Sequence, residues 1–157
     1  MNVQQKNKEK GFTIIEVVLV LAIAGLIFLM VFIALPALQR GQRDQQRKND
    51  LSRAQTAINN YQSNNRNGLP GATSAAWNST IRDQYLTVGG DTFTDPSQGD
   101  YSFSYQGTNR TTPTTLSNII YVHTSSTCDG ESVVAAGANK VALSFKLEGG
   151  GVACVNN

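Results

Sequence analysis

Apolar residues dominate one segment near the start of the chain. Residues 12–38 are apolar apart from Thr13, Glu16 and two residues that weaken helices, Gly25 and Pro36. The last 22 residues of this segment carry no charge. A helix of about 20 consecutive apolar residues spans the hydrocarbon core of a bilayer, which is about 30 Å thick. The pattern therefore predicts a helix that crosses a membrane.

After residue 38 the pattern turns polar, and the helix is predicted to continue as a stalk over residues 39–66. Residues 39–50 are polar apart from Gly41 and are rich in Gln and Arg, which are good helix formers. An apolar stripe at helical spacing follows, and we expect it to pack on a globular head. Its residues are Leu51, Ala54, Ile58 and Tyr61. The sequence Asn-Gly-Leu-Pro at 67–70 predicts the end of the helix, because it offers a left-handed cap and then a proline.

Shorter patterns predict a head over residues 67–157. A helix is expected at 75–86, capped by Thr73 or Ser74, with large apolar residues four apart on one face. The residues of that face are Trp77, Ile81 and Tyr85. Strands are expected at residues 101–105, 119–123, 141–148 and 151–155, the third buried on one face. The predicted fold class is α+β, with the long helix packed on a small antiparallel sheet.

The distribution of charge along the chain is more informative about its partners than the net charge. The formal net charge of +2 resides in the first 11 residues, which hold three lysines and one glutamate. Without them the chain has ten basic and ten acidic residues, so we do not expect nucleic acid as a partner. Residues 40–66 carry a net charge of +4, and residues 67–157 carry −3. Either the basic stalk meets acidic heads of neighbouring copies, or it is a solvated polar helix.

Glu16 is the most informative single residue. An ionisable residue in a membrane segment costs about 2.5–3.5 kcal/mol at the bilayer centre and is by default a functional hypothesis. The polar residues 1–10 before the apolar segment carry Lys6, Lys8 and Lys10. A secretory signal peptide has a similar basic start, but its apolar stretch is usually about 7–15 residues and ends in a small-residue cleavage site. A plain uncleaved anchor is the other ordinary interpretation.

The residues at 10–16, Lys-Gly-Phe-Thr-Ile-Ile-Glu, resemble the cleavage motif of type IV prepilins and pseudopilins, with a class III-type leader. The resemblance covers residues 10–38. It implies that a prepilin peptidase cuts on the cytoplasmic side after Gly11 and methylates the new amine of Phe12. It also implies that Glu16 is the assembly glutamate. The implied domains are a leader at 1–11, a transmembrane and assembly helix at 12–38, a stalk at 39–66 and a head at 67–157.

A cut after Gly11 would place a positive amine four residues before Glu16, about 6 Å along a helix. The amine of a neighbouring copy would give Glu16 an opposite charge in a low-dielectric setting, where such a pair favours one register more than it adds stability. Gly25 and Pro36 weaken the helix, and in resembling proteins such a segment can lose helicity inside a filament. The ordinary alternative is a membrane helix that tolerates both residues.

Three residue groups in the head carry candidate chemistry. Cys128 and Cys154 are the only cysteines, and outside the cytoplasm we expect them to form a disulfide that closes about 27 residues, with two free thiols as the alternative. His123 is the only histidine and is expected to be structural. A last group is either solvated turn carboxylates or a calcium site. Its residues are Asp91, Asp95 and Asp100.

Together these patterns favour a structural subunit of a type IV pilus-like filament, with no enzymatic activity and no cofactor. The resemblance implies as partners other copies in a helical homopolymer, a prepilin peptidase, the membrane, and indirectly an assembly platform with its ATPase. It implies a single-pass precursor in the cytoplasmic (inner) membrane with its head outside, and then an extracellular pilus, which can serve adhesion or twitching motility. The alternatives are a pseudopilin of a type II secretion or DNA-uptake system, and a membrane-tethered binding head that never polymerises.

Overall fold

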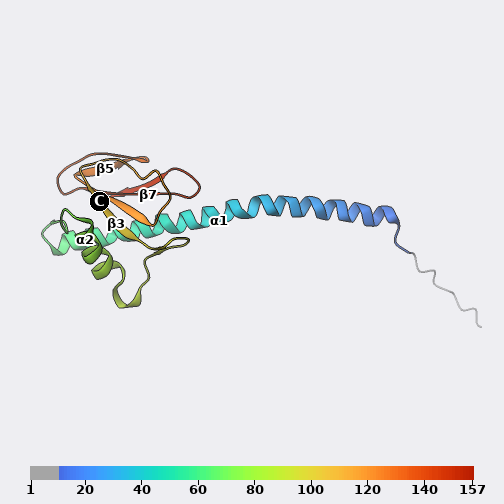
Figure 1. Ribbon diagram of the computed structural model, residues 1–157, viewed down its shortest axis with the longest axis horizontal. Coiled ribbons are helices and arrows are strands. Elements are labelled where there is room, and N and C mark those ends of the chain that lie inside the picture. Colours follow the sequence, from blue (N-terminus) through green and yellow to red (C-terminus); the bar gives the residue numbers. More distant parts are fainter. Residues whose placement is uncertain (1–10) are drawn as a thin grey trace, which may run out of the picture. The chain divides into compact units, whose positions relative to one another are not determined.

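The computed structural model describes residues 11–157 (Figure 1). The predicted leader at 1–11 therefore lies outside the described residues, except for Gly11. The chain divides into two compact units, one that ends at Leu38 and one that covers Gln39–Asn157. Helix α1, Ile14–Asn64, contributes to both units.

In the first unit, α1 leaves its apolar side chains uncovered. None of the residues from Ile14 to Leu38 is buried within the structure. Within the described residues this is the one helix that is long and apolar enough to cross a membrane, and its most apolar window of 18 residues has a mean hydropathy of 3.2. The helix runs without interruption through Gly25 and Pro36. The prediction of a helix of membrane-spanning length is confirmed.

The stalk part of α1 ends at Asn64, two residues earlier than predicted. Backbone φ angles of 52° at Arg66 and 62° at Asn67 turn the chain away from the helix. The Asn67 N–H donates to the Gln62 carbonyl oxygen at 2.8 Å, which satisfies one of the carbonyls that a helix end leaves without a partner. The expected left-handed cap is therefore present at Asn67, and Arg66 joins it although this conformation is uncommon for residues other than glycine.

The second unit contains the stalk, three short helical segments and three small sheets. The helical segments are α2 (Ser74–Trp77), the π-helix η1 (Asn78–Leu86) and the 3₁₀ turn η2 (Val88–Gly90). The strands are β1 (Thr94–Asp95), β2 (Gly99–Asp100), β3 (Ser102–Gly107), β4 (Ile119–Thr124), β5 (Ser126–Asp129), β6 (Ser132–Ala135), β7 (Val141–Lys146) and β8 (Val152–Asn156). The main sheet has the order β3-β4-β7-β8, whereas β1–β2 and β5–β6 are separate pairs.

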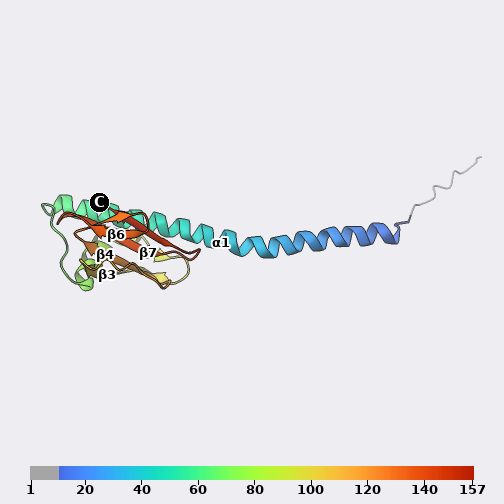
Figure 2. The same ribbon diagram turned by 90° about the horizontal axis from the view of Figure 1, so that it is seen from above.

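The main sheet is mixed rather than wholly antiparallel. Strand β7 pairs antiparallel with both β4 and β8, but β3 pairs parallel with β4. The parallel pair arises because residues 108–118 cross back to the end of the sheet at which β3 began, so that β4 runs in the same direction. The predicted α+β architecture, a long helix packed on a small sheet, is confirmed with this correction. The hairpin β5–β6, which lies beside the main sheet in Figure 2, was not predicted.

The helix predicted at 75–86 is present, but most of it has a wider turn than an α-helix. Thr73 caps it as expected, because the Ala76 N–H donates to the Thr73 hydroxyl oxygen at 3.2 Å. The i→i+5 hydrogen bonds of a π-helix bring residues four and five apart onto one face. The buried residues of this face are Trp77, Ile81 and Leu86. Tyr85, which was predicted from α-helical spacing, is only half buried.

The apolar stripe of the stalk packs into the core of the head, as predicted. Three of its four residues are buried there, and Tyr61 is half buried at its edge. The rings of Phe93 and Tyr101, with centroids 4.7 Å apart, belong to the same core. Strand β7 departs from the prediction, because Ala142 and Ser144 on its second face are also fully buried. The first face belongs to the core that the stalk shares, through Leu143 and Phe145, and β7 also contacts β5 of the separate hairpin.

A buried ion cluster joins the beginning of the stalk to the head. Arg47 is only 1% exposed, and it donates to Asp95 at 2.6 and 3.1 Å. It also donates to Asp44 at 3.0 Å and to Glu148 at 3.2 Å. Burial alone would raise the pKa of Asp95, but the hydrogen bonds from Arg47 and Ser97 and the charge of Arg47 together outweigh burial and lower it. Because a buried charge must be paired and hydrogen-bonded, these carboxylates are what permits an arginine in the core.

The turn between β7 and β8 binds to the stalk through the same cluster. Asp44 accepts the backbone N–H groups of Glu148 and Gly149 at 2.8 and 2.7 Å. Glu148 accepts from Arg43 at 2.7 Å, and mainly through hydrogen bonds from Arg43 its pKa is lowered to about 2. The carboxylate of Glu148 is therefore ionised at neutral pH, where it holds the turn against the stalk.

Replacing Arg47 by methionine is expected to lower the free energy of unfolding by about 3–5 kcal/mol, because Asp95 would stay buried without its partner. Arg82→Met is the control, since Arg82 pairs with Asp83 at the surface and such pairs contribute about 0–1 kcal/mol. Urea unfolding of the full chain in detergent, followed by the fluorescence of the buried Trp77, measures both. Equal losses in the two variants would contradict the assigned role of the cluster.

Candidate functional site

The beginning of α1 is closed by reciprocal hydrogen bonds between Thr13 and Glu16. The Thr13 N–H and hydroxyl both donate to Glu16 Oε2 at 2.8 Å, and the Glu16 N–H donates to the Thr13 hydroxyl oxygen at 3.4 Å. This arrangement is a capping box, in which a threonine and a glutamate three residues later satisfy each other's free backbone groups. Sequence analysis missed it, although the signal Thr-Ile-Ile-Glu stands at residues 13–16.

The cap leaves part of the Glu16 carboxylate free. Both side-chain bonds end on Oε2, and Oε1 accepts no hydrogen bond within the part of the chain that the structure describes. Glu16 borders an open hollow of about 210 Å³ together with four apolar side chains, which are Phe12, Val17, Val20 and Leu21. A cation that approached Oε1 would meet Glu16 in apolar surroundings, where charges attract more strongly than in water.

Gly25 and Pro36 do not break α1 in this structure. A proline inside a helix removes one backbone hydrogen bond and costs about 3 kcal/mol. Membrane helices tolerate such residues when the freed backbone groups find other partners. Both residues therefore remain weak points of an intact helix, and the loss of helicity between them inside a filament stays a prediction.

The basic residues of the stalk are used mainly within their own chain. Arg43 and Arg47 bind carboxylates of the head, and Arg53 bonds to Asp50 at 3.3 Å. The interpretation of the stalk as a solvated polar helix is therefore wrong for Arg47, which needs its partners in order to be buried. Three cations of the stalk are exposed and form no ion pair among residues 11–157. These are Arg40, Lys48 and Arg66.

The three turn carboxylates do not act as one group. Asp95 is buried and bound to Arg47, so it is neither solvated nor available to calcium. Asp91 and Asp100 are exposed, as expected of solvated turn residues. Among the described residues no group of three or more carboxylate, histidine or cysteine side chains could hold a metal ion.

His123 is structural, as predicted. It is fully buried in β4, with Nδ1 2.6 Å from the Asn109 carbonyl oxygen and Nε2 2.8 Å from the Ser144 hydroxyl oxygen. Because a carbonyl oxygen only accepts, Nδ1 carries the proton and Nε2 accepts from the serine. Burial lowers the pKa of His123, which favours this neutral ring. Both nitrogens are occupied in binding β4 to its surroundings.

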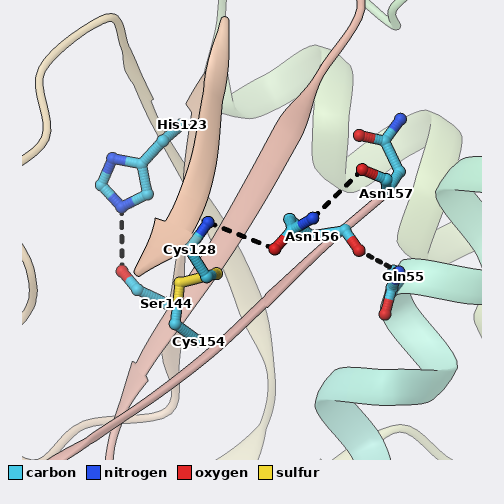
Figure 3. Close-up of a disulfide and its surroundings, with 7 residues drawn as sticks. All are labelled: Gln55, His123, Cys128, Ser144, Cys154, Asn156 and Asn157. Atoms are coloured by element: carbon cyan, nitrogen blue, oxygen red, sulfur yellow. Dashed lines mark hydrogen bonds between the residues drawn. A yellow bond between two sulfur atoms is a disulfide. The ribbon is translucent and has the colours of Figure 1, made fainter. Parts of the chain in front are cut away.

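Cys128 and Cys154 form the predicted disulfide, with their Cα atoms 5.8 Å apart (Figure 3). Cys128 lies in β5, a strand that was predicted as a loop, and Cys154 lies in β8. The Cys128 N–H also donates to Asn156 Oδ1 at 3.2 Å, and the Asn156 carbonyl oxygen accepts from Gln55 of the stalk. The disulfide therefore holds the β5–β6 hairpin on the last strand of the main sheet, which is itself bound to the stalk.

Replacing both cysteines by serine is expected to lower the free energy of unfolding by roughly 3.5 kcal/mol, the chain-entropy value for a closed loop of this length. The serines fit because both cysteines are only half buried, so that no large cavity is created. Thermal unfolding of the oxidised chain, the reduced chain and the double variant measures the effect. A reduced chain as stable as the oxidised one would contradict the prediction.

Comparison with known proteins concerns the N-terminal part of the chain. The family model for the prokaryotic N-terminal methylation motif matches residues 6–32, which include Gly11, Phe12 and Glu16. A search of the curated proteins and a search of the solved structures return no match. The motif implies processing by a prepilin peptidase and assembly into type IV filament systems, and its family is structural rather than enzymatic. Residues 6–32 therefore carry the class III leader that is characteristic of type IV pilins and pseudopilins.

Proposed function

We propose that the chain is the structural subunit of a type IV pilus-like filament and has no enzymatic activity of its own. Prepilin peptidase cuts after Gly11 and methylates the amine of Phe12. The processed chain waits in the cytoplasmic membrane with its head outside and is then incorporated into an extracellular homopolymer through residues 12–38. A pseudopilin carries the same kind of leader, and abundance in sheared surface material separates it from a shaft subunit.

One observation supports this proposal above the others: the apolar part of α1 has no cover within its own chain. Its side chains from Ile14 to Leu38 are not buried in the structure. Burial of apolar surface is worth about 25 cal/mol per Å², so exposure of the whole helix to water is strongly unfavourable. The helix must therefore lie either in lipid or among other helices. A filament built on a bundle of such helices provides the second environment.

The exchange of lipid for neighbouring helices has little hydrophobic driving force, because lipid tails are as apolar as the side chains. Packing between helices and specific polar contacts must select the assembled state. Glu16 is the ionisable group in residues 12–38, and its Oε1 atom is open to a partner. The methylated amine of Phe12 in a neighbouring copy is the cation that the motif supplies. Their pairing would set the axial register of the filament, while an assembly ATPase elsewhere would supply the energy.

Glu16→Gln is expected to lower the yield of sheared filaments at least about tenfold, because removing one partner of a buried ion pair costs about 3–5 kcal/mol. Glutamine can replace glutamate in a capping box, so this variant removes the charge and keeps the cap. Thr13→Val is the matched control, since it removes the capping hydroxyl and keeps the charge of Glu16. Electron microscopy and quantification of sheared material, normalised to the level of subunit in the membrane, measure both.

Filaments of normal yield and length from Glu16→Gln would contradict the proposed role of Glu16 and favour a tethered head that never polymerises. Loss of filaments in Thr13→Val alone would show that the cap, rather than the charge, is what assembly requires.

A further inference from the structure

A groove of about 420 Å³ runs along the outer side of the stalk in the second unit. Polar residues of α1 form one wall, and they are Asn49, Ser52, Thr56 and Asn60. The opposite wall comes from η1 and the segment after it, through Tyr85, Leu86 and Asp91. The α1 wall covers 12 residues of helix, Asn49 to Asn60, whose first and last Cα atoms are about 16 Å apart along the axis at 1.5 Å per residue. The groove is therefore long enough to receive a few turns of another helix.

Two hydroxyl groups of the α1 wall can be removed from water with little loss of hydrogen-bonding free energy. The hydroxyl of Ser52 donates to the Lys48 carbonyl oxygen, and that of Thr56 donates to the Ser52 carbonyl oxygen, both at 3.0 Å. Burying a polar group is costly when it loses a partner in water and gains none. These hydroxyls already have partners in their own helix, so a second molecule could cover them without leaving a donor unsatisfied.

The groove contains one carboxylate, that of Asp91, which forms no ion pair with any of residues 11–157. Arg53 also lines it, but its guanidinium bonds to Asp50 at 3.3 Å and lies 5.8 Å from the centre of the Phe93 ring. Asp91 is exposed and forms no ion pair within residues 11–157. The groove therefore presents an unpaired carboxylate at one wall, and a matching partner must bring a cation.

A matching cation lies elsewhere on the same stalk, outside the groove. Gly41, Gln45 and Lys48 are spaced by four and three residues, which places them on one face of α1, and all three are exposed. Lys48 forms no ion pair with the described residues. Gly41 has no side chain, so another backbone can approach this face closely. The face thus combines one cation, one amide and little bulk.

We propose that the groove receives the face formed by Gly41, Gln45 and Lys48 from the stalk of a second copy, with Lys48 of one copy opposite Asp91 of the next. This inference rests on the proposed function, because it names the contact between stalk and head within the filament. The two surfaces differ, so each copy can offer its lysine face to one neighbour and its groove to another. A heterologous contact of this kind produces an open helical polymer when its rotation does not close into a ring, whereas a self-complementary contact stops at a dimer.

Cross-linking between two distinguishable chains tests the contact. One full-length chain carries Lys48→Cys, and a co-expressed chain with a short tag carries Asp91→Cys, so that a disulfide between them must be intermolecular. After mild oxidation of sheared filaments, we expect a mixed dimer on a non-reducing gel. The control pair is Lys48→Cys with Lys140→Cys, because Lys140 lines a different hollow. Filaments that form but give no more mixed dimer than the control pair would overturn the proposal.

Charge exchange provides the second test. Lys48→Glu and Asp91→Lys each place like charges opposite each other, which costs several kcal/mol at an interface, so each is expected to lower filament yield roughly tenfold or more. The double variant Lys48→Glu/Asp91→Lys restores the pair and is expected to recover most of the yield. Arg66→Glu, the same change of charge at an exposed residue beyond the end of α1, should have little effect.

The outcomes distinguish a failure of the Lys48–Asp91 contact from a failure of the proposed function. Normal filaments from both single variants, or a double variant no better than either, would overturn the Lys48–Asp91 contact and leave the filament itself standing. Absence of filaments from the unaltered chain, with its head still exported, would overturn the proposed function and this inference with it.

Discussion

The uncovered apolar helix is the constraint on which the other features depend. No side chain between Ile14 and Leu38 is buried by the rest of the chain, so this segment has no stable place in water. It needs lipid or other helices around it at every stage. A membrane-bound precursor and a filament of packed helices would both meet this requirement. In the proposed filament, assembly is a transfer of the helix between two apolar environments, selected by a small number of polar contacts.

Two charges of α1 are explained by their partners. Glu16 is half satisfied, because Oε2 closes the helix cap with Thr13 and Oε1 accepts no hydrogen bond from residues 11–157. Arg47 is fully satisfied by Asp44, Asp95 and Glu148, all within its own chain. In the proposed filament, the Oε1 atom of Glu16 binds a cation of another copy, whereas the ion pairs of Arg47 fix the head on its stalk. Under the proposed function, charge serves assembly at the N-terminal end of the helix, whereas farther along it holds the head on the stalk.

Much of the fold follows from local patterns in the sequence. The length of the apolar segment, the stripe from Leu51 to Tyr61, the left-handed cap at Asn67 and the Thr73 cap are all set by neighbouring residues, and the structure contains each of them. The Thr13–Glu16 capping box is equally local and could have been read from the spacing of the two residues. The disulfide could be predicted because the chain has two cysteines and the leader motif predicts a head outside the cytoplasm.

What could not be predicted depends on residues far apart in the chain. Arg47 continues the apolar stripe, four residues before Leu51, but its partners Asp95 and Glu148 lie 48 and 101 residues away. The parallel pairing of β3 with β4 depends on the path of an irregular crossover, which no periodicity encodes. The groove along the stalk exists only because η1 folds against it, and η1 itself is a π-helix that α-helical spacing does not predict.

The most direct test of the central claim is the intact mass and N-terminal sequence of the protein isolated from the surface of its native cells. The account predicts a chain that begins at an N-methylated Phe12 and lacks the first 11 residues. A chain that retains Met1, or one that begins near Leu38, would contradict it. The first result would leave a head anchored by an unprocessed apolar helix, and the second a secreted head that has lost this helix.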